Sequence, residues 1–167
     1  IVKRTVQIDH DEAVFYHAKN KLHQFARENS APFFLNASFI HPHEPYCTLQ
    51  EYWDLYRHED IALPNTPLQP ELERELHTTR MLHHAMLVDT GISEAHVRIA
   101  RHAYLGNVSY FDEMVGGLMK TLEQTGLLAN TVVVISADHG DMLGEHGLWY
   151  KKHFFEDCIR VPLIIHW

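Results

Sequence analysis

Residues 131–151 read TVVVISADHGDMLGEHGLWYK, and this stretch decides the fold class. The β-branched run at residues 131–135 predicts a strand buried on both faces, as in a parallel sheet. A glycine-rich loop follows the strand and carries an acid, an imidazole and a lysine, namely Asp138, His139 and Lys151. Ligands of open α/β sheets collect beyond the carboxyl ends of the strands, so we expect this loop to lie in the functional site.

Helices and strands alternate in the rest of the chain. Asp9 and Glu12 have the spacing of a capping box, which predicts an amphipathic helix that lasts until the polar run at residues 27–30. Ser93 can cap a longer helix, which closes at Gly126. Two further apolar runs have the length of strands, at residues 33–40 and 161–165. This order of elements is typical of an α/β fold.

Composition limits the classes of function. The chain has 167 residues and is 46% hydrophobic, which is enough for one core, so we expect a single domain over residues 1–167. It has no apolar stretch of about 18 residues, so we expect no membrane partner. Acidic residues outnumber basic ones by 22 to 14, and the resulting net charge of -8 disfavours nucleic acid. Cys47 and Cys158 lack the spacing of a disulfide framework, which favours a reducing compartment, and we expect the cytoplasm.

Asp138 and His139 are the predicted metal ligands. Adjacent carboxylate and imidazole groups at the end of a strand can bind one divalent cation, while Gly140 lets the backbone turn away without steric cost. Oxygen ligands favour calcium or magnesium, and a single imidazole leaves manganese as an alternative. We expect calcium.

A second group of candidate residues follows the apolar run at residues 33–40. His43 lies between Pro42 and Pro45, which restrict the backbone and hold the imidazole at a defined place. It therefore suits a proton donor to a leaving group. We interpret the neighbouring His41 as a structural histidine.

The far end of the glycine-rich loop holds the predicted anion ligand. Lys151 follows three bulky residues that can anchor the loop and present the ammonium group to an anionic ester oxygen. The polar residues between the metal ligands and this lysine are interpreted as groups that stabilise the loop, namely Asp141, Glu145 and His146.

These motifs resemble the sulfatases of the alkaline-phosphatase superfamily, and most closely the choline sulfatases. The resemblance covers nearly the whole chain and is most specific in DHGDMLGE at residues 138–145, GLWYK at 147–151 and SFIHPHEPY at 38–46. It implies an alkaline-phosphatase-like, mostly parallel sheet flanked by helices, of which this chain holds an incomplete part. It also implies the roles of four residues: Asp138 and His139 bind the active-site divalent cation, His43 protonates the leaving alkoxide, and Lys151 binds the sulfate.

The family's nucleophile is the point at which the sequence departs from the resemblance. Sulfatases use a formylglycine made from the cysteine of a Cys-x-Pro-x-Arg motif, and neither Cys47 nor Cys158 stands in such a motif. We therefore interpret the chain as an internal piece of a longer enzyme, with the formylglycine upstream, and we expect the isolated piece to be inactive.

Three functions stay open at this point. The first is a metal-dependent hydrolase of a small sulfate ester, with choline sulfate as the expected substrate. The second is a phosphonate monoester or phosphodiester hydrolase on the same scaffold, and the third is a non-catalytic metal-binding module. A choline headgroup favours an aromatic cage, for which the candidates are Tyr46, Trp53, Tyr56, Trp149 and Tyr150. The resemblance to the family also leaves open whether the protein forms a homo-oligomer.

Overall fold

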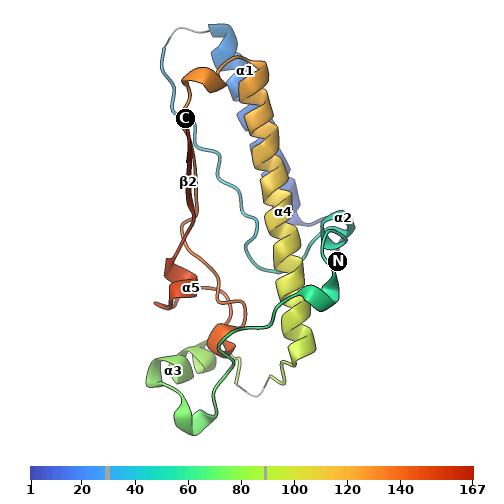
Figure 1. Ribbon diagram of the computed structural model, residues 1–167, viewed down its shortest axis with the longest axis vertical. Helices are drawn as coiled ribbons and strands as arrows, with labels where there is room; N and C mark the ends of the chain where they lie inside the picture. The colour runs from blue at the N-terminus through green and yellow to red at the C-terminus, as the bar shows by residue number, and fades with distance from the viewer. Residues whose placement is uncertain (29–30, 89) are drawn as a thin grey trace. The chain divides into compact units, whose positions relative to one another are not determined.

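The computed structural model describes residues 1–28, 31–88 and 90–167 (Figure 1). Its longer helices are α1 (Val6–Glu28), α3 (Leu76–His84) and α4 (Glu94–Gln124). One-turn helices are α2 (Gln50–Trp53) and α5 (Glu156–Ile159), and the strands are β1 (Val133–Ser136) and β2 (Leu163–His166). Short 3-10 turns lie at His58–Asp60, Glu71–Glu73, Leu128–Asn130 and Glu145–Gly147.

The described chain forms two compact units, each with its own core. Unit 1 consists of Ile1–Tyr56, Ala103–Val134 and Ile165–Trp167, and unit 2 consists of Arg57–His102 and Ile135–Ile164. The single-domain interpretation of the sequence stays a prediction. In the described residues, no helix has both the length and the apolar character that a bilayer span requires.

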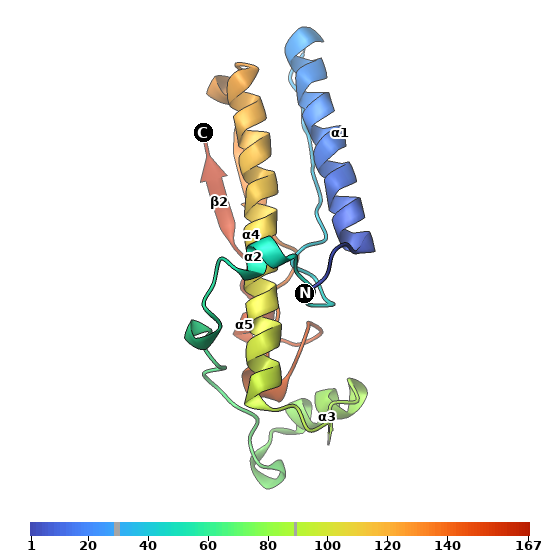
Figure 2. The ribbon, with the colours of Figure 1, turned by 90° about the vertical axis from the view of Figure 1, so that its right-hand side faces the viewer.

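In unit 1, helix α1 and the second half of α4 lie side by side (Figure 2). Ile8 of α1 packs against Tyr110 of α4 and Tyr52 of α2, and all three side chains are buried. Further along both helices, the Phe15 ring occupies the space next to Gly117. A Cβ at Gly117 would come within 2.5 Å of that ring. These contacts place α1 firmly against α4.

The start of α1 differs from the predicted one. The helix begins at Val6, and Thr5 caps it because its hydroxyl accepts a hydrogen bond from the backbone N–H of Ile8 at 3.2 Å. Asp9 lies inside the first turns and pairs with the exposed Arg4. The capping box predicted at Asp9 is therefore wrong by one turn.

Both predicted ends of the long helix α4 are confirmed. The Ser93 hydroxyl accepts a hydrogen bond from the backbone N–H of His96 at 3.4 Å, as an N-cap does. At the other end, Gly126 has a φ of +75°, the left-handed conformation that commonly closes a helix.

Residues 33–40 form an extended segment but no strand, so the predicted strand is not found here. Side-chain exposure alternates along the segment with the period of two that a strand has. Its inward side chains pack on the helices: Phe33 stacks on Phe25 of α1 at 4.5 Å, and Phe39 meets Phe111 of α4 at 5.6 Å. A strand is defined by hydrogen bonds to a neighbour, and none pairs with this segment among the described residues.

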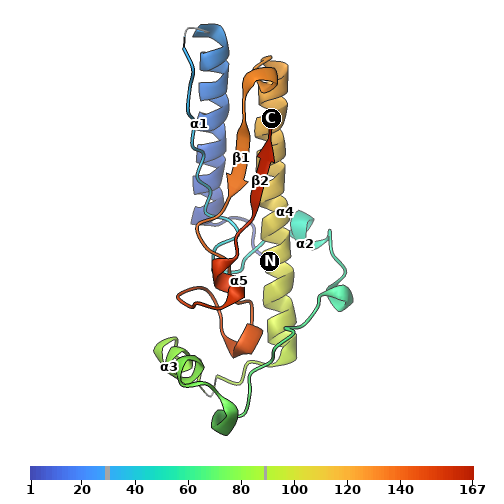
Figure 3. The same ribbon diagram turned by 60° about the vertical axis from the view of Figure 1, so that its left-hand side comes forward.

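The predicted strands at residues 131–135 and 161–165 are found as β1 and β2, which pair with each other. The two strands run in opposite directions (Figure 3), and the Ser136 hydroxyl at the end of β1 donates to the carbonyl of Pro162 just before β2. Burial on both faces was expected but is not observed, since Val134, Leu163 and Ile164 are exposed. The chain between β1 and β2 leaves β1 and enters β2 at the same end of the strand pair, so the two strands run antiparallel.

Candidate functional site

Asp138 and His139 lie together directly after β1. His139 Nε2 is 3.8 Å from Asp138 Oδ2, and the Asp138 side chain is 91% exposed. His139 Nδ1 donates to the carbonyl of Gly140 at 2.8 Å, because a carbonyl oxygen can only accept. That hydrogen bond fixes the tautomer in which Nε2 carries the lone pair that a metal ion needs. The structure thus brings a carboxylate and an imidazole together, and their role as ligands of a divalent cation stays a prediction.

The pair alone would not make a whole coordination shell. Across the described ranges 1–28, 31–88 and 90–167, no group of three or more His, Cys, Asp or Glu side chains is placed to hold a metal ion. The chemistry of the two donors nevertheless fits calcium, magnesium or manganese, as the sequence predicts.

Gly140 holds Asp138 and His139 against the segment before β2. Its backbone N–H donates to the carbonyl of Cys158 at 2.7 Å. A Cβ at this position would lie 1.9 Å from the carbonyl oxygen of Asp157, far inside contact distance. The glycine is therefore required by the close approach of two backbone segments rather than by its φ angle.

Replacing Gly140 by Ala is expected to destabilise the full-length protein, by which we mean the product of the reading frame that encodes these residues. The backbone clash should lower the free energy of unfolding by about 3 kcal/mol. Gly116→Ala is the matched control, because Gly116 lies in α4 with nothing within 4 Å of the added Cβ. It should change stability by less than about 1 kcal/mol. Urea unfolding measures both, and equal effects would show that Gly140 is not under steric constraint.

The loop after Gly140 folds back on itself and carries Lys151 at its end. The N–H of Met142 donates to the carbonyl of Tyr150 at 2.9 Å, and the N–H of Gly144 donates to Leu148 at 2.9 Å. Met142 and Leu148 are fully buried, in a cluster with Leu82 of α3 and Cys158 of α5. Lys151 directly follows Tyr150, which this hydrogen bond holds, and its role as an anion ligand stays a prediction.

Glu145 ties the loop to the proline-rich segment of unit 2. Its two carboxylate oxygens accept the backbone N–H groups of Asn65 and Thr66 at 2.9 and 2.8 Å. Arg101 lies 3.6 Å from the same carboxylate and donates to the carbonyl of Leu143 at 3.0 Å. The loop-stabilising role predicted for Glu145 is therefore confirmed, and Asp141, which accepts from the N–H of Leu143 at 3.1 Å, acts similarly.

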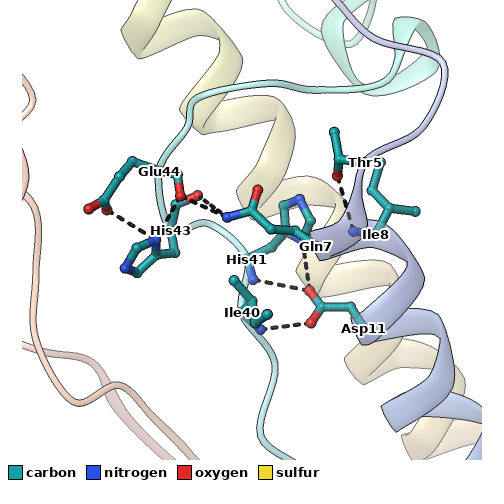
Figure 4. A network of polar contacts seen from close by, with 8 residues as sticks. All are labelled: Thr5, Gln7, Ile8, Asp11, Ile40, His41, His43 and Glu44. Carbon is teal, nitrogen blue, oxygen red and sulfur yellow. Dashed lines mark hydrogen bonds and ion pairs between the residues drawn. The ribbon is translucent and has the colours of Figure 1, made fainter.

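His43 belongs to unit 1 and lies in a tight turn (Figure 4). Its backbone N–H donates to the carbonyl of Ile40 at 3.0 Å. The ring Nδ1 donates to the carbonyl of Glu44 at 2.7 Å and lies 3.2 Å from the Glu44 carboxylate. The side chain is 39% exposed, so the ring can meet a ligand. These contacts orient the imidazole, and the proton-donor role of His43 stays a prediction.

His41, by contrast, is a buried structural group, as predicted. Its Nδ1 lies 2.7 Å from Oδ2 of Asp11, a residue of α1 that has no exposed surface. Burial alone would raise the pKa of Asp11, but hydrogen bonds from His41 and from two backbone amides outweigh it and hold that pKa below its usual value. The ionised carboxylate thus stabilises the fold above the unfolded-state pKa, and this contribution disappears as the pH falls through the lower folded-state value.

The five aromatic candidates for a choline cage are divided between the units. Tyr46 meets Tyr104 edge to face at 6.1 Å, and the Tyr56 hydroxyl is 2.7 Å from that of Ser109, both within unit 1. Trp53 closes helix α2 of the same unit. In unit 2, Trp149 is buried and Tyr150 is exposed. The aromatic cage stays a prediction.

The chain is similar in sequence to a known protein family and in fold to several solved structures. Residues 3–167 match the family model described as Sulfatase. The choline-sulfatase of Rhizobium meliloti (strain 1021) is 40% identical over 169 aligned residues, which cover 99% of this chain and 33% of that protein. The phosphonate monoester hydrolase of Agrobacterium radiobacter has a TM-score of 0.75 at 21% identity, with 91% of this chain and 32% of that chain covered.

A further solved structure, in complex with its substrate D-glucosamine-2-N,6-O-disulfate, also gives a TM-score of 0.75. It is 22% identical, and the match covers 94% of this chain and 42% of that chain. Both structural likenesses confirm the α/β fold class predicted from the sequence. The chain spans about a third of the length of the choline-sulfatase that it matches.

Proposed function

Since this chain belongs to the sulfatase family, we propose that it forms part of a metal-dependent hydrolase that cleaves choline sulfate into choline and sulfate. The 40% identity to a choline-sulfatase over 99% of the chain is the observation that carries the proposal. The paired metal ligands after β1 and the oriented imidazole of His43 support it. We also propose that the enzyme works in the cytoplasm, which two cysteines outside any disulfide favour.

We propose that Asp138 and His139 are two of the ligands of the cation, with calcium as the expected ion and manganese or magnesium as alternatives. When bound, the cation would neutralise negative charge that develops on the sulfate oxygens. Lys151 would contact the sulfate and the bridging ester oxygen with its ammonium group. The two cationic charges together would favour the transition state over the ground state, because charge on the bridging oxygen grows as the ester bond breaks.

His43 is proposed as the group that protonates the leaving choline oxygen. Nδ1 is engaged by the carbonyl of Glu44, so the proton would be delivered from Nε2. The Glu44 carboxylate, 3.2 Å from Nδ1, would help to hold the ring in this orientation during the transfer. Choline leaves as an alkoxide, the conjugate base of a weakly acidic alcohol. A proton donor therefore contributes more here than it would for an activated aryl ester.

The nucleophile is proposed to come from outside these residues. Cys158 is buried, and burial raises the pKa of its thiol, which disfavours the reactive thiolate. Neither it nor Cys47 stands in a Cys-x-Pro-x-Arg motif. The longer protein would supply the formylglycine, and a hydroxyl of its hydrated form would be the nucleophile.

The direct test compares substrates in the full-length protein. Sulfate release from choline sulfate should be at least about tenfold more efficient than hydrolysis of phenyl phosphonate monoesters, measured as kcat/KM. Purified residues 1–167 alone should give no turnover, because the nucleophile is missing. A preference for the phosphonate would favour the second function, and metal binding without hydrolysis of either ester would favour a binding module. Turnover by residues 1–167 alone would contradict the proposed origin of the nucleophile.

A further inference from the structure

A buried carboxylate on α1 holds the backbone that leads to His43. Asp11 has no exposed surface, and each hydrogen bond that its carboxylate accepts comes from one of two consecutive residues (Figure 4). Oδ1 accepts the N–H of Ile40 at 2.7 Å, while Oδ2 accepts the N–H of His41 at 3.0 Å and its ring Nδ1 at 2.7 Å. Asp11 therefore joins α1 to a point about 30 residues further along the chain.

The preceding helical turn of α1 holds the other side of the loop that contains His43. Gln7 lies four residues before Asp11, on the same helix face, and its side-chain amide donates to the carbonyls of Glu44 at 2.7 Å and His43 at 3.4 Å. One face of α1 thus contacts the residues before His43 through Asp11, and the residues at and after it through Gln7. The turn that bears the proposed proton donor is fixed on both sides.

The His41 ring makes this attachment rigid. It is 4% exposed and lies edge to face against Tyr110 of α4, with ring centroids 4.8 Å apart. The ring is therefore held by a charge-assisted hydrogen bond at one edge and by an aromatic contact. A hydrogen bond from a buried imidazole to a buried, ionised carboxylate allows little movement, whereas an exposed salt bridge would allow much.

We propose that Asp11 and His41 are positioning residues, which place the His43 imidazole for proton transfer without contacting the substrate. The proposal rests on the proposed function, because it assumes that His43 protonates the leaving group. A displacement of about 1 Å at a proton donor lowers the rate by up to about 10²-fold. The pair would therefore affect catalysis through geometry as well as stability.

The test uses Asp11→Asn in the full-length protein and two substrates. The amide keeps the shape of the side chain but turns an NH₂ group toward backbone and ring donors. Hydrolysis of choline sulfate should fall by about 10²-fold in kcat, with KM changed by less than about threefold. Hydrolysis of 4-nitrophenyl sulfate, whose leaving group needs no proton, should fall by less than about threefold. Asp9→Asn is the matched control, because Asp9 is on the same helix and 55% exposed, and it should change neither rate.

A merely structural role predicts a different result, in which both substrates are affected equally or only the thermal unfolding midpoint falls. His41 provides a second pair of variants in case Asp11→Asn does not fold. His41→Asn keeps a donor near the Nδ1 position and should retain most of the choline sulfate activity, whereas His41→Leu should lose about 10²-fold on this substrate alone. Equal activity of the two His41 variants, or equal losses on both substrates, would overturn the proposal.

Failure of the proposed function is distinguishable from failure of this inference. If His43→Ala loses selectively on choline sulfate while the Asp11 and His41 variants do not, His43 is the proton donor and the positioning role is wrong. If His43→Ala shows no selectivity between the two substrates, the function assigned to His43 is wrong, and the positioning role falls with it.

Discussion

Asp138→Ala is expected to lower kcat/KM for choline sulfate in the full-length protein by about 10³-fold, and to reduce the bound divalent metal. Asp138 is the exposed carboxylate beside His139, with 3.8 Å between Oδ2 and Nε2. Without it the imidazole alone must hold the cation on this side of the site, and a site that loses a ligand loses both affinity and charge stabilisation.

Kinetics and metal analysis together check this prediction. Metal content per protein chain, measured by inductively coupled plasma mass spectrometry after dialysis, should fall well below that of the wild type. Asp60→Ala is a suitable control, because Asp60 is 66% exposed, lies in the same unit and pairs with the exposed Arg57 at 3.7 Å. It should leave metal content and rate unchanged. Full metal occupancy with full activity in Asp138→Ala would show that the cation is held elsewhere.

His43→Ala is expected to reduce hydrolysis of choline sulfate by about 10²- to 10⁴-fold, the range for loss of a general acid. The effect on 4-nitrophenyl sulfate should be less than about tenfold, because nitrophenolate leaves without a proton. The physical basis is the orientation of the ring, whose Nδ1 is bound to the carbonyl of Glu44. A series of esters with leaving groups of rising pKa should give a steeper dependence of rate on leaving-group pKa in the variant than in the wild type.

His17→Ala is the control for the loss of an imidazole. His17 is an exposed residue of α1, whose ring contacts the neighbouring Tyr16. The variant should match the wild type on every ester of the series. If His43→Ala lost the same factor on all the esters, His43 would act in binding or folding rather than in proton transfer.

The sequence predicted what local chemistry determines. The ends of α4 follow from the hydroxyl of Ser93 and the left-handed conformation of Gly126, both of which act within a few residues. The adjacency of Asp138 and His139 after a β-branched strand is equally local, and the structure shows the two side chains together. The family motifs pointed to the same residues, and the comparison of the whole chain confirms the family.

The sequence did not predict contacts that join distant segments. In the sequence, Asp11 is one polar residue of an amphipathic helix. Its neighbours in the sequence do not indicate that it is buried against His41, 30 residues away. The N-H groups that Glu145 binds lie about 80 residues before it. Residues 33–40 have the composition and the alternating exposure of a strand, but a strand also needs a hydrogen-bonded neighbour, which composition does not supply.

The central proposal is that Asp138 and His139 bind the catalytic cation and that His43 protonates the leaving oxygen. A crystal structure of the full-length protein with manganese and an unreactive choline sulfate analogue tests it most directly. We predict an anomalous manganese peak about 2.0–2.4 Å from Asp138 and His139, with His43 Nε2 about 3 Å from the bridging atom of the analogue. A manganese peak away from these two ligands, or His43 tens of ångströms from the analogue, would contradict the account.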